Sequence, residues 1–473
     1  MKKTKIVATI GPASEKTSTI KRMLQAGMNV CRLNFSHGTH TNHAQLIHSI
    51  RDASKLSGLP VAILQDLQGP RIRLGMLPPE GVELSQGDKV TLKPESLCKG
   101  HSSHKVLPSQ YGKLAKEVKK GQIILFKDGL MRVQVTKVDN LSLVCEVLEG
   151  GLLKSHQGMN VPGANLSIPV MTDKDRRDIL FGVRHNIDWI ALSFVKDGHD
   201  IQGLREFVVR HGGSQGIIAK IERMEAIENL EGILDYVDGV MIARGDLGVE
   251  LPPEKVPVLQ KEIIQMCLER AKPVIVATQM LESMISSPRP TRAEASDVAN
   301  AVVDQADAVM LSGESAFGKY PLQAVDMMRK IIEEMEATHY DERERVLPKI
   351  KGKFEEVDDI ARGIARMCKD SSLNLIIALA ADPYEVQLIS RYRPEARILV
   401  MTDEHILQKR LSLTYGAYTE VVHPEYTLDT LLKKALVIAH KKGLAKKGER
   451  ALVVAGQKLE KKHEMCVVSI MDT

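Results

Sequence analysis

The sequence predicts an α/β protein: a (β/α)8 TIM barrel with an inserted small β-barrel domain and a C-terminal α/β domain. Two observations lead to this prediction. Eight short apolar, β-branched runs alternate with stretches of helical period over the first 320 residues, and more than 120 residues of different texture interrupt the alternation once. In addition, a chain of 473 residues is long enough for about three domains.

The eight apolar runs are typical of parallel strands that are covered on both faces, because they lack the polar alternation of half-exposed strands. They span residues 5–10, 29–35, 61–67, 189–195, 216–222, 239–246, 273–280 and 308–315. Eight strands that alternate with helices favour a closed barrel. An open doubly wound sheet also fits the pattern, because strand order cannot be read from one sequence.

The interruption after the third run contains short alternating segments broken by Gly, Asp and Asn, which predict a small antiparallel β domain. These segments are 82–93, 122–126, 131–138 and 141–148. After a charged linker at 341–356, strand-like runs resume at 373–380, 396–402, 419–423, 451–456 and 465–471, and the last two are expected to pair as an antiparallel edge. The predicted domains are therefore a barrel of 1–69 and 170–345, an inserted domain of 70–169, and a C-terminal domain of 346–473.

Composition limits the functions that the chain can have. Lys plus Arg exceeds Asp plus Glu by 65 − 60 = 5, and aromatic residues make up only 4%. These values suit small anionic substrates and argue against nucleic acid as a partner. No apolar run approaches the ~20 residues of a membrane span, and the first apolar stretch is too short for a signal peptide. None of the six cysteines forms a CxxC pair, so we expect a reduced, cytoplasmic setting without a membrane partner.

The second run ends in polar residues that strand alternation places on one face. Arg32, Asn34 and Ser36 share that face, while Leu33 and Phe35 lie on the other. Inward-facing Arg, Asn and Ser side chains need an anionic ligand or an ion as a partner. A solvated strand end is the alternative, but the carboxyl ends of barrel strands are where active sites form.

The fifth and sixth runs end in a lysine and two carboxylates. Lys220 and Glu222 are two residues apart and therefore side by side, and Asp246 follows the neighbouring strand. A Glu and an Asp at adjacent strand ends can hold one Mg2+, and the ammonium group beside them can stabilise charge on a transferring phosphoryl group. A structural Lys–Glu ion pair is the alternative, but it leaves Asp246 unassigned.

Together, several segments of the chain resemble pyruvate kinase. They are RLNFSHG at 32–38, DLQGPRIR at 66–73, AKIE at 219–222, ARGDLGVE at 243–250, ATQMLESM at 277–284, PRPTRAE at 288–294 and MLSGES at 310–315. The resemblance extends over essentially the whole chain, is weakest after about residue 350, and points to the bacterial, K+-independent type with a divergent C-terminal effector domain.

The resemblance implies a homotetramer that transfers the phosphoryl group of phosphoenolpyruvate to ADP, giving pyruvate and ATP in the last step of glycolysis. It implies dependence on Mg2+, for which Mn2+ can substitute. By position in this sequence, the implied catalytic residues are Lys220, Arg32, Thr278 and Ser312. The implied substrate-binding residues are Arg32, Lys220, Gly245, Asp246 and Thr278, the nucleotide-binding residues are Asn34, His37, Arg73 and Lys174, and the Mg2+ ligands are Glu222 and Asp246.

The resemblance departs from many pyruvate kinases at the K+ site. The positions that hold K+ in those relatives are Asn34, Ser36, Asp66 and Leu67 here. The K+-dependent form has Thr in place of Leu67 and Glu in place of Arg71, whereas the K+-independent form has Leu, Gln and Lys at positions 67, 68 and 71. Since Arg71 is a fixed cation, we expect that it replaces the ion and that K+ is not required.

The terminal domain departs as well. The loop that binds a sugar phosphate in regulated relatives reads AADPYE at 380–385, without hydroxyls and with two carboxylates, and a later Gly-rich loop is replaced by 457–463. We therefore expect no fructose bisphosphate binding there, which direct binding measurements would test. Two alternative functions remain: a catalytically silent, pyruvate-kinase-like metabolite sensor, and a barrel lyase that uses phosphoenolpyruvate or pyruvate.

Overall fold

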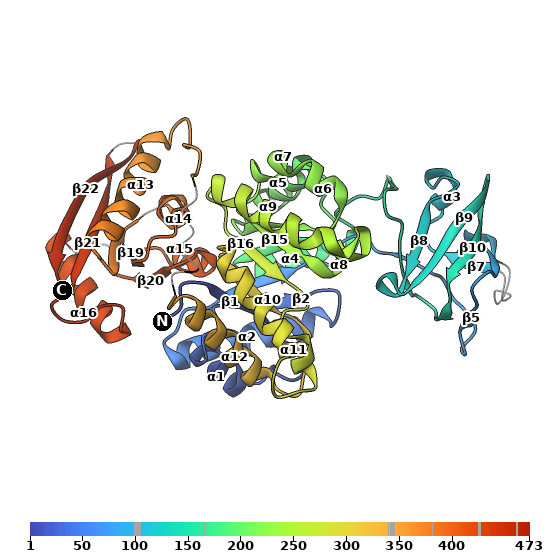
Figure 1. Cartoon of the computed structure of the whole chain (residues 1–473), viewed down its shortest axis with the longest axis horizontal. Coiled ribbons are helices and arrows are strands. Elements are labelled where there is room, and N and C mark those ends of the chain that lie inside the picture. Colours follow the sequence, from blue (N-terminus) through green and yellow to red (C-terminus); the bar gives the residue numbers. More distant parts are fainter. Residues whose placement is uncertain are drawn as a thin grey trace.

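The computed structural model consists of three bodies in a row (Figure 1). The central one is a barrel, with the inserted domain at one end of the molecule and the C-terminal domain at the other. The structure describes residues 1–98, 106–164, 166–338, 340, 346–380, 382–423, 427–459 and 462–473, and the side chains of all of these except 128, 456–459 and 462–468. In this part of the chain no helix has the length and apolarity needed to cross a membrane.

The central body is a closed barrel of eight parallel strands, which confirms the predicted fold class and excludes the open sheet. Closure follows from β1, which pairs with β2 on one side and with β17 on the other. The strands in spatial order are β1 (Lys5–Thr9), β17 (Ala308–Leu311), β16 (Val274–Ala277), β15 (Gly239–Ala243), β14 (Gly216–Ile221), β13 (Trp189–Leu192), β3 (Ala62–Asp66) and β2 (Val30–Asn34).

Helices surround the barrel and cover the outward-facing side chains of its strands. The longer ones are α1 (Thr17–Gln25), α2 (His40–Ser57), α4 (Asp173–Arg184), α5 (Gly198–Arg210), α9 (Val256–Glu269), α10 (Arg292–Val303) and α12 (Pro321–Met335). Shorter ones are α6 (Met224–Glu228), α7 (Leu230–Leu234), α8 (Arg244–Glu250) and α11 (Gly313–Ala316). The N-terminus of α10 is fixed by a capping box between Thr291 and Glu294.

The barrel has two apolar layers, and β2 shows how alternation separates them. Val30 faces the barrel interior, whereas Cys31 and Leu33 face the surrounding helices. The interior is filled by large side chains, including the single Trp189, whose ring lies where any side chain on Gly216 would have to be. The interior is therefore a packed core rather than a pore.

The inserted domain is a seven-stranded sheet that curls into a barrel-like shape. Its strands in spatial order are β4 (Ile72–Arg73), β12 (Gly158–Asn160), β8 (Ile123–Phe126), β9 (Met131–Asp139), β10 (Ser142–Glu149), β6 (Lys89–Pro94) and β7 (Val106–Ser109). A bridge between Leu74 and Ser109 brings the two edge strands together. A two-stranded ribbon of β5 (Val82–Leu84) and β11 (Gly151–Leu153) and the short α3 (Leu114–Glu117) complete the domain.

The C-terminal domain is a five-stranded sheet in the order β20 (Ala417–Val421), β19 (Arg397–Thr402), β18 (Leu375–Leu379), β21 (Arg450–Leu459) and β22 (Lys462–Asp472). The last two strands pair antiparallel, as predicted. Its helices are α13 (Glu355–Asp370), α14 (Pro383–Arg391), α15 (His405–Arg410) and α16 (Leu428–Lys442). Within the two loops expected to lack effector binding, residue 381 and residues 460 and 461 lie outside the described residues.

Candidate active site

A polar cavity opens at the carboxyl ends of the barrel strands, where the chain leaves β3 for the inserted domain. It brings together most of the residues that the sequence singled out. These are Arg32, Asn34, Ser36, Asp66, Arg71, Lys220, Glu222, Asp246 and Thr278. They come from β2, β3 and β14 and from the segments that follow β2, β3, β14, β15 and β16, so the closed barrel brings them together.

Lys220 lies at the centre of the charged groups and is buried. Its ammonium nitrogen is 2.7 Å from Glu222 Oε1 and 3.2 Å from Asp66 Oδ1, and it donates to Ser193 Oγ at 2.8 Å. Burial alone would lower the pKa of Lys220, but the negative charges of Asp66, Glu222 and Asp246 outweigh burial and raise it. The lysine is therefore a permanent cation at neutral pH, suited to bind and stabilise a negative group rather than to act as a base.

Arg32 supplies a second cation on the same wall. Its Nε donates to Asp66 Oδ2 at 2.6 Å, and its Nη1 donates to Thr9 Oγ1 at 2.8 Å. Burial opposes ionisation of Asp66, but Lys220 and Arg32 together overcome it and lower its pKa. Asp66 therefore acts as a fixed anion that orients two cations toward the cavity.

Glu222 and Asp246 are the two carboxylates that could hold a divalent cation. Glu222 is almost fully buried, and burial raises its pKa to about 7, with Lys220 opposing and the charge of Asp246 adding to the increase. The contact of Asp246 Oδ1 with Arg71 is long, at 3.7 Å. Two crowded carboxylates of this kind fit a hard cation such as Mg2+. Since no cluster of three or more His, Cys, Asp and Glu side chains suited to a metal occurs among the described residues, substrate and water would supply the remaining ligands.

Thr278 lies just after β16 in a conformation that β-branched residues rarely adopt, with φ +71°. Its hydroxyl accepts a hydrogen bond from the Gly245 N–H at 2.7 Å and donates to the Ala277 carbonyl at 2.6 Å. Arg244 stabilises the adjoining loop through two 2.7 Å bonds to Asp297 and one of 2.8 Å to the Thr278 carbonyl. This support accounts for how the strained backbone is maintained.

Ser312 follows β17, and its hydroxyl oxygen is buried without a hydrogen-bond partner among the described residues. The neighbouring Glu314 is fully buried and accepts from the backbone N–H groups of Ser312 at 2.7 Å and Leu281 at 3.0 Å. Glu314 thus joins the ends of two adjacent strands and fixes the position of Ser312. Ser312 itself is not among the residues that line the polar cavity.

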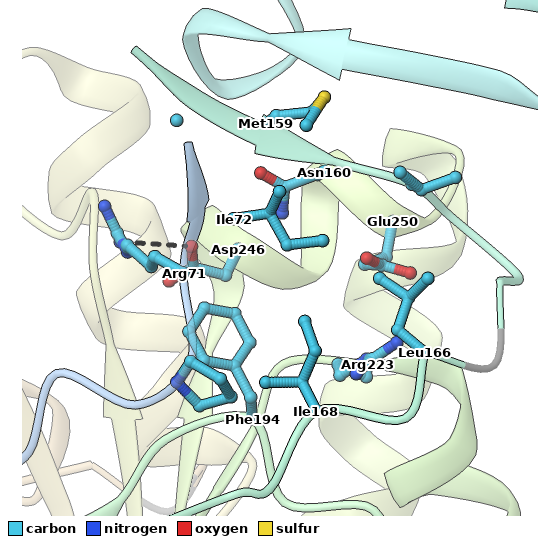
Figure 2. A pocket seen from close by; sticks show the side chains of 13 residues that line it. Arg71, Ile72, Met159, Asn160, Leu166, Ile168, Phe194, Arg223, Asp246 and Glu250 are labelled. Atoms are coloured by element: carbon cyan, nitrogen blue, oxygen red, sulfur yellow. Dashed lines mark ion pairs between the residues drawn. The ribbon is translucent and has the colours of Figure 1, made fainter. Parts of the chain in front are cut away.

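A second cavity adjoins the first and lies between the barrel and the two segments that connect the inserted domain (Figure 2). Figure 2 shows Ile72 of β4 above the ring of Phe194 and Ile168 of the segment that returns to the barrel beside it, with Glu250 pointing into the space. The ion pair of Arg71 with Asp246 closes one side. The segment that leads to the inserted domain therefore contacts one of the two candidate metal ligands.

The predicted monovalent-cation positions differ in what they can offer. Asn34, Ser36 and Asp66 line the polar cavity together with Arg71. The side chain of Leu67 is instead buried in the barrel core, and its carbonyl accepts a 2.7 Å hydrogen bond from Ser193. Leu67 therefore contributes no side-chain oxygen to this wall.

The remaining predicted nucleotide contacts do not line the polar cavity. His37 is exposed in the loop after β2. Lys174 lies at the start of α4, where its Nζ donates to the Phe35 carbonyl and to Asp178 Oδ2, both at 2.6 Å. Arg73 lies on β4 in the inserted domain and donates to the His156 carbonyl at 3.1 Å.

Sequence reasoning missed Ser193 and Phe194, which directly follow β13 and line the polar cavity. A signal for them existed, because they stand at the carboxyl end of the fourth apolar run, where the barrel rule places functional groups. Their lack of charge made them less conspicuous than the ends of the neighbouring strands.

Comparison with known proteins gives one consistent result. Residues 1–325 match the family model described as pyruvate kinase, barrel domain, and residues 358–470 match pyruvate kinase, alpha/beta domain. A pyruvate kinase of Geobacillus stearothermophilus is 43% identical over 462 residues, covering 96% of this chain and 78% of that protein. One of Clostridium acetobutylicum is 38% identical over 460 residues, covering 96% of each chain.

A solved structure agrees with these sequence relatives. The crystal structure of a pyruvate kinase from Cryptosporidium parvum superimposes with a TM-score of 0.92 at 35% identity, covering 100% of this chain and 96% of that one. The match therefore extends over the inserted and C-terminal domains as well as the barrel. The chain belongs to the pyruvate kinase family and is a kinase.

Proposed function

We propose that this enzyme transfers the phosphoryl group of phosphoenolpyruvate to ADP and forms pyruvate and ATP. The observation that supports this most directly is the arrangement around Lys220, whose ammonium group lies 2.7 Å from Glu222 and shares one cavity with Asp246 and Arg32. Phosphoryl transfer depends mainly on positioning and on stabilising negative charge, and two fixed cations beside a pair of metal-binding carboxylates provide both.

Glu222 and Asp246 are the residues that would hold Mg2+, or Mn2+ in its place. When bound, such an ion neutralises charge on phosphoryl oxygens and orients them. Lys220 and Arg32 would contact the phosphoryl group, and the N–H groups of Gly245 and Asp246 would bind the carboxylate of phosphoenolpyruvate. In the structure the Gly245 N–H donates to the Thr278 hydroxyl at 2.7 Å, so binding of the substrate carboxylate would replace this hydrogen bond.

Pyruvate formation also requires a proton to be added to the enolate carbon. Thr278 and Ser312 would serve this step, since both hydroxyls follow neighbouring strands and that of Ser312 is buried without a partner among the described residues. Asn34, His37, Arg73 and Lys174 would contact ADP. Closure of the inserted domain over the cavity would exclude water and bring Arg73 toward the nucleotide. The family membership supports a cytoplasmic homotetramer.

We further propose that the enzyme does not need K+. Leu67 offers no hydroxyl, its carbonyl is bonded to Ser193, and the guanidinium of Arg71 lies in the same cavity as Asn34, Ser36 and Asp66. The test is ATP formation from phosphoenolpyruvate and ADP with Mg2+, in buffer free of Na+ and K+ and again with K+ added. Equal rates are expected for the wild type.

Replacing the built-in cation should restore the need for the ion. Arg71→Glu should lower activity without K+ by at least ~10-fold and recover with K+, because a mobile cation can then occupy the site. Arg132→Glu, which reverses a charge at an exposed pair with Glu149 in the inserted domain, is the control and should stay independent of K+. A steep K+ requirement in the wild type would contradict the proposal.

The two alternative functions are separated by measuring phosphoenolpyruvate binding and the consumption of phosphoenolpyruvate or pyruvate together with ATP formation. Binding of phosphoenolpyruvate without turnover would favour a metabolite sensor. Consumption of phosphoenolpyruvate or pyruvate without ATP formation would favour a lyase. The presence of Lys220, Glu222, Asp246 and Thr278 in one cavity argues against the sensor.

A further inference from the structure

Ser193 and Phe194 form a short corner between β13 and the following loop, which we call the β13 corner. Ser193 is 1% exposed and Phe194 lines the cavity below the connecting segments of the inserted domain (Figure 2). The corner lies between the end of β3, from which the inserted domain departs, and the end of β14, which provides Lys220 and Glu222. It therefore contacts both parts of the candidate active site.

The hydroxyl of Ser193 has one defined role on each side. It donates its single proton to the Leu67 carbonyl at 2.7 Å and accepts from Lys220 Nζ at 2.8 Å. Because the proton is committed to Leu67, a lone pair of the oxygen points at the lysine. The ammonium group of Lys220 donates a hydrogen bond to Ser193 and forms ion pairs with Asp66 and Glu222. Without the hydroxyl, one proton of a buried ammonium group would lose its partner.

The backbone of the β13 corner holds Glu222 by a hydrogen bond, as the Ser193 hydroxyl holds Lys220. The Phe194 N–H donates to Glu222 Oε2 at 2.7 Å, while Glu222 Oε1 faces Lys220. Phe194 has φ +58°, a strained conformation for a bulky residue, and this turn aims its N–H at the carboxylate. Adjacent residues of one corner thus fix the lysine and the glutamate relative to each other.

The β13 corner also packs against the segment that leads from β3 to the inserted domain. A Cβ atom on Gly69 would lie 2.9 Å from Ser193 Cβ and 2.9 Å from Phe194 Cδ2, so the exit segment passes as close as a glycine allows. Gly69 itself has φ +67°. The corner is therefore held between the exit segment and the two charged residues.

From this geometry we propose that Ser193 is a positioning residue that fixes the ammonium group of Lys220 for phosphoryl transfer. The inference deepens the proposed function and rests on it, since Lys220 is the group that would touch the phosphoryl oxygens. Asp66 and Glu222 attract the ammonium group by charge, which is weakly directional. The neutral hydroxyl, anchored on Leu67, adds a third fixed direction without adding negative charge.

The test compares Ser193→Ala with a matched control, Ser390→Ala. Ser390 is also 1% exposed, also donates to a backbone carbonyl, that of Tyr415 at 2.9 Å, and also accepts from a cation, Arg393 Nη1 at 3.3 Å. It lies in the C-terminal domain, away from the cavity. Both variants should unfold at similar temperatures, because each loses the same type of buried hydrogen bonds.

Their kinetics should differ. For Ser193→Ala we expect kcat to fall ~10- to 100-fold, with the KM for ADP and the Mn2+ affinity within about twofold of the wild type, because a misplaced reacting group lowers the rate rather than nucleotide or metal binding. Ser193→Thr, which keeps the hydroxyl, should recover part of kcat. Ser390→Ala should keep the wild-type kcat. A kcat of Ser193→Ala equal to that of Ser390→Ala would overturn the inference.

A second measurement does not depend on turnover. The 1H–15N signal of a lysine ammonium group is observed when its protons exchange slowly, and Lys220→Met identifies the signal of Lys220. We expect that signal in the wild type and in Ser390→Ala, and its loss in Ser193→Ala. Its persistence in Ser193→Ala would overturn the positioning role. Absence of ATP formation by the wild type would refute the proposed function instead, whatever the signal shows.

Discussion

Two charged side chains near the cavity differ in how they are stabilised. Lys220 has three partners within 3.2 Å, whereas Glu250, at the end of α8, has no hydrogen-bond or ion-pair partner among the described residues and points into the cavity below the inserted domain (Figure 2). Burial raises the pKa of Glu250 from its ordinary 4.5 to about 7, with Arg223 opposing and Glu225 and Asp246 adding to the increase. Glu250 is therefore a source of pH-dependent instability.

The sign of this effect follows from proton binding. Between about pH 4.5 and 7 the folded state binds more protons at Glu250 than the unfolded state, so the free energy of unfolding falls as pH rises through that window. Glu250→Gln cannot titrate. It should match the wild type below pH 4.5 and exceed it by up to ~3 kcal/mol above pH 7, measured by denaturant unfolding.

A control variant separates this effect from a general one. Glu254→Gln changes an exposed glutamate that lies four residues after Glu250. The difference between its free energy of unfolding and that of the wild type should not vary with pH between pH 4.5 and 7. A Glu250→Gln curve parallel to the wild-type curve from pH 4.5 to 8 would show that burial of Glu250 has no thermodynamic effect.

Among single residues, the sequence identified charged groups better than neutral ones. Arg32, Lys220, Glu222 and Asp246 were found because a buried charge needs a partner and strand periodicity indicates which face it lies on. Ser193 was missed because a serine at a strand end is common and its contact with Lys220 joins positions 27 residues apart. Only the closed barrel brings these residues together.

At the scale of elements, the segment that leads from β3 to the inserted domain passes very close to the β13 corner. Gly69 combines φ +67° with a close approach to the β13 corner, since a Cβ atom on it would lie 2.9 Å from each of two side chains there. Gly69→Ala would strain the turn and push Ser193 and Phe194 away from Lys220 and Glu222. We expect it to lower kcat ~10- to 100-fold while the protein remains folded.

A second glycine provides the control for this variant. Gly58 ends α2 at φ +67° as well, but a Cβ there meets no atom within 4 Å. Gly58→Ala should therefore show the cost of the left-handed backbone alone, ~1 kcal/mol of stability, with unchanged kcat. Equal activities of the two variants would show that contact with the β13 corner does not matter for catalysis.

Elements were predictable in proportion to their length and regularity. All eight barrel strands were recognised from apolar runs, and the antiparallel edge of the C-terminal sheet from its short connection. The strands β4, β11 and β12 were not predicted, because they have two or three residues each and too few positions to show alternation, and the four-residue β7 was not predicted either. Their pairing depends on the tertiary contacts of the inserted domain.

At the scale of the whole molecule, the C-terminal domain packs against the amino ends of the barrel strands through a buried ion pair. Asp307, just before β17, accepts from Arg393 Nη1 at 3.2 Å and Nη2 at 2.9 Å, and also from the Tyr415 N–H at 3.1 Å. Leu413 extends from the same domain into the interior core of the barrel. This docking was not predictable from the sequence, because a pattern within one domain gives no information about which surface of another it meets.

Removing one member of this pair should be costly. Asp307→Ala would leave the guanidinium of Arg393, which is 6% exposed, without its counter-charge, so we expect a loss of ~3–5 kcal/mol in the free energy of unfolding. Asp429→Ala, which breaks an ion pair with Lys433 whose side chains are 82% and 78% exposed, should change stability by less than ~0.5 kcal/mol. Similar stabilities of the two variants in denaturant unfolding would contradict the docking role of Asp307.

The measurement that tests the central claim most directly is ATP formation from phosphoenolpyruvate and ADP with Mg2+, by the wild type and by Lys220→Met side by side. The wild type should form ATP and pyruvate in equal amounts. Lys220→Met should lose at least ~10^2- to 10^3-fold in rate while still binding Mn2+, because it removes the cation beside the proposed metal ligands and leaves Glu222 and Asp246 in place. ATP formation by Lys220→Met at the wild-type rate, or none by the wild type, would contradict the account.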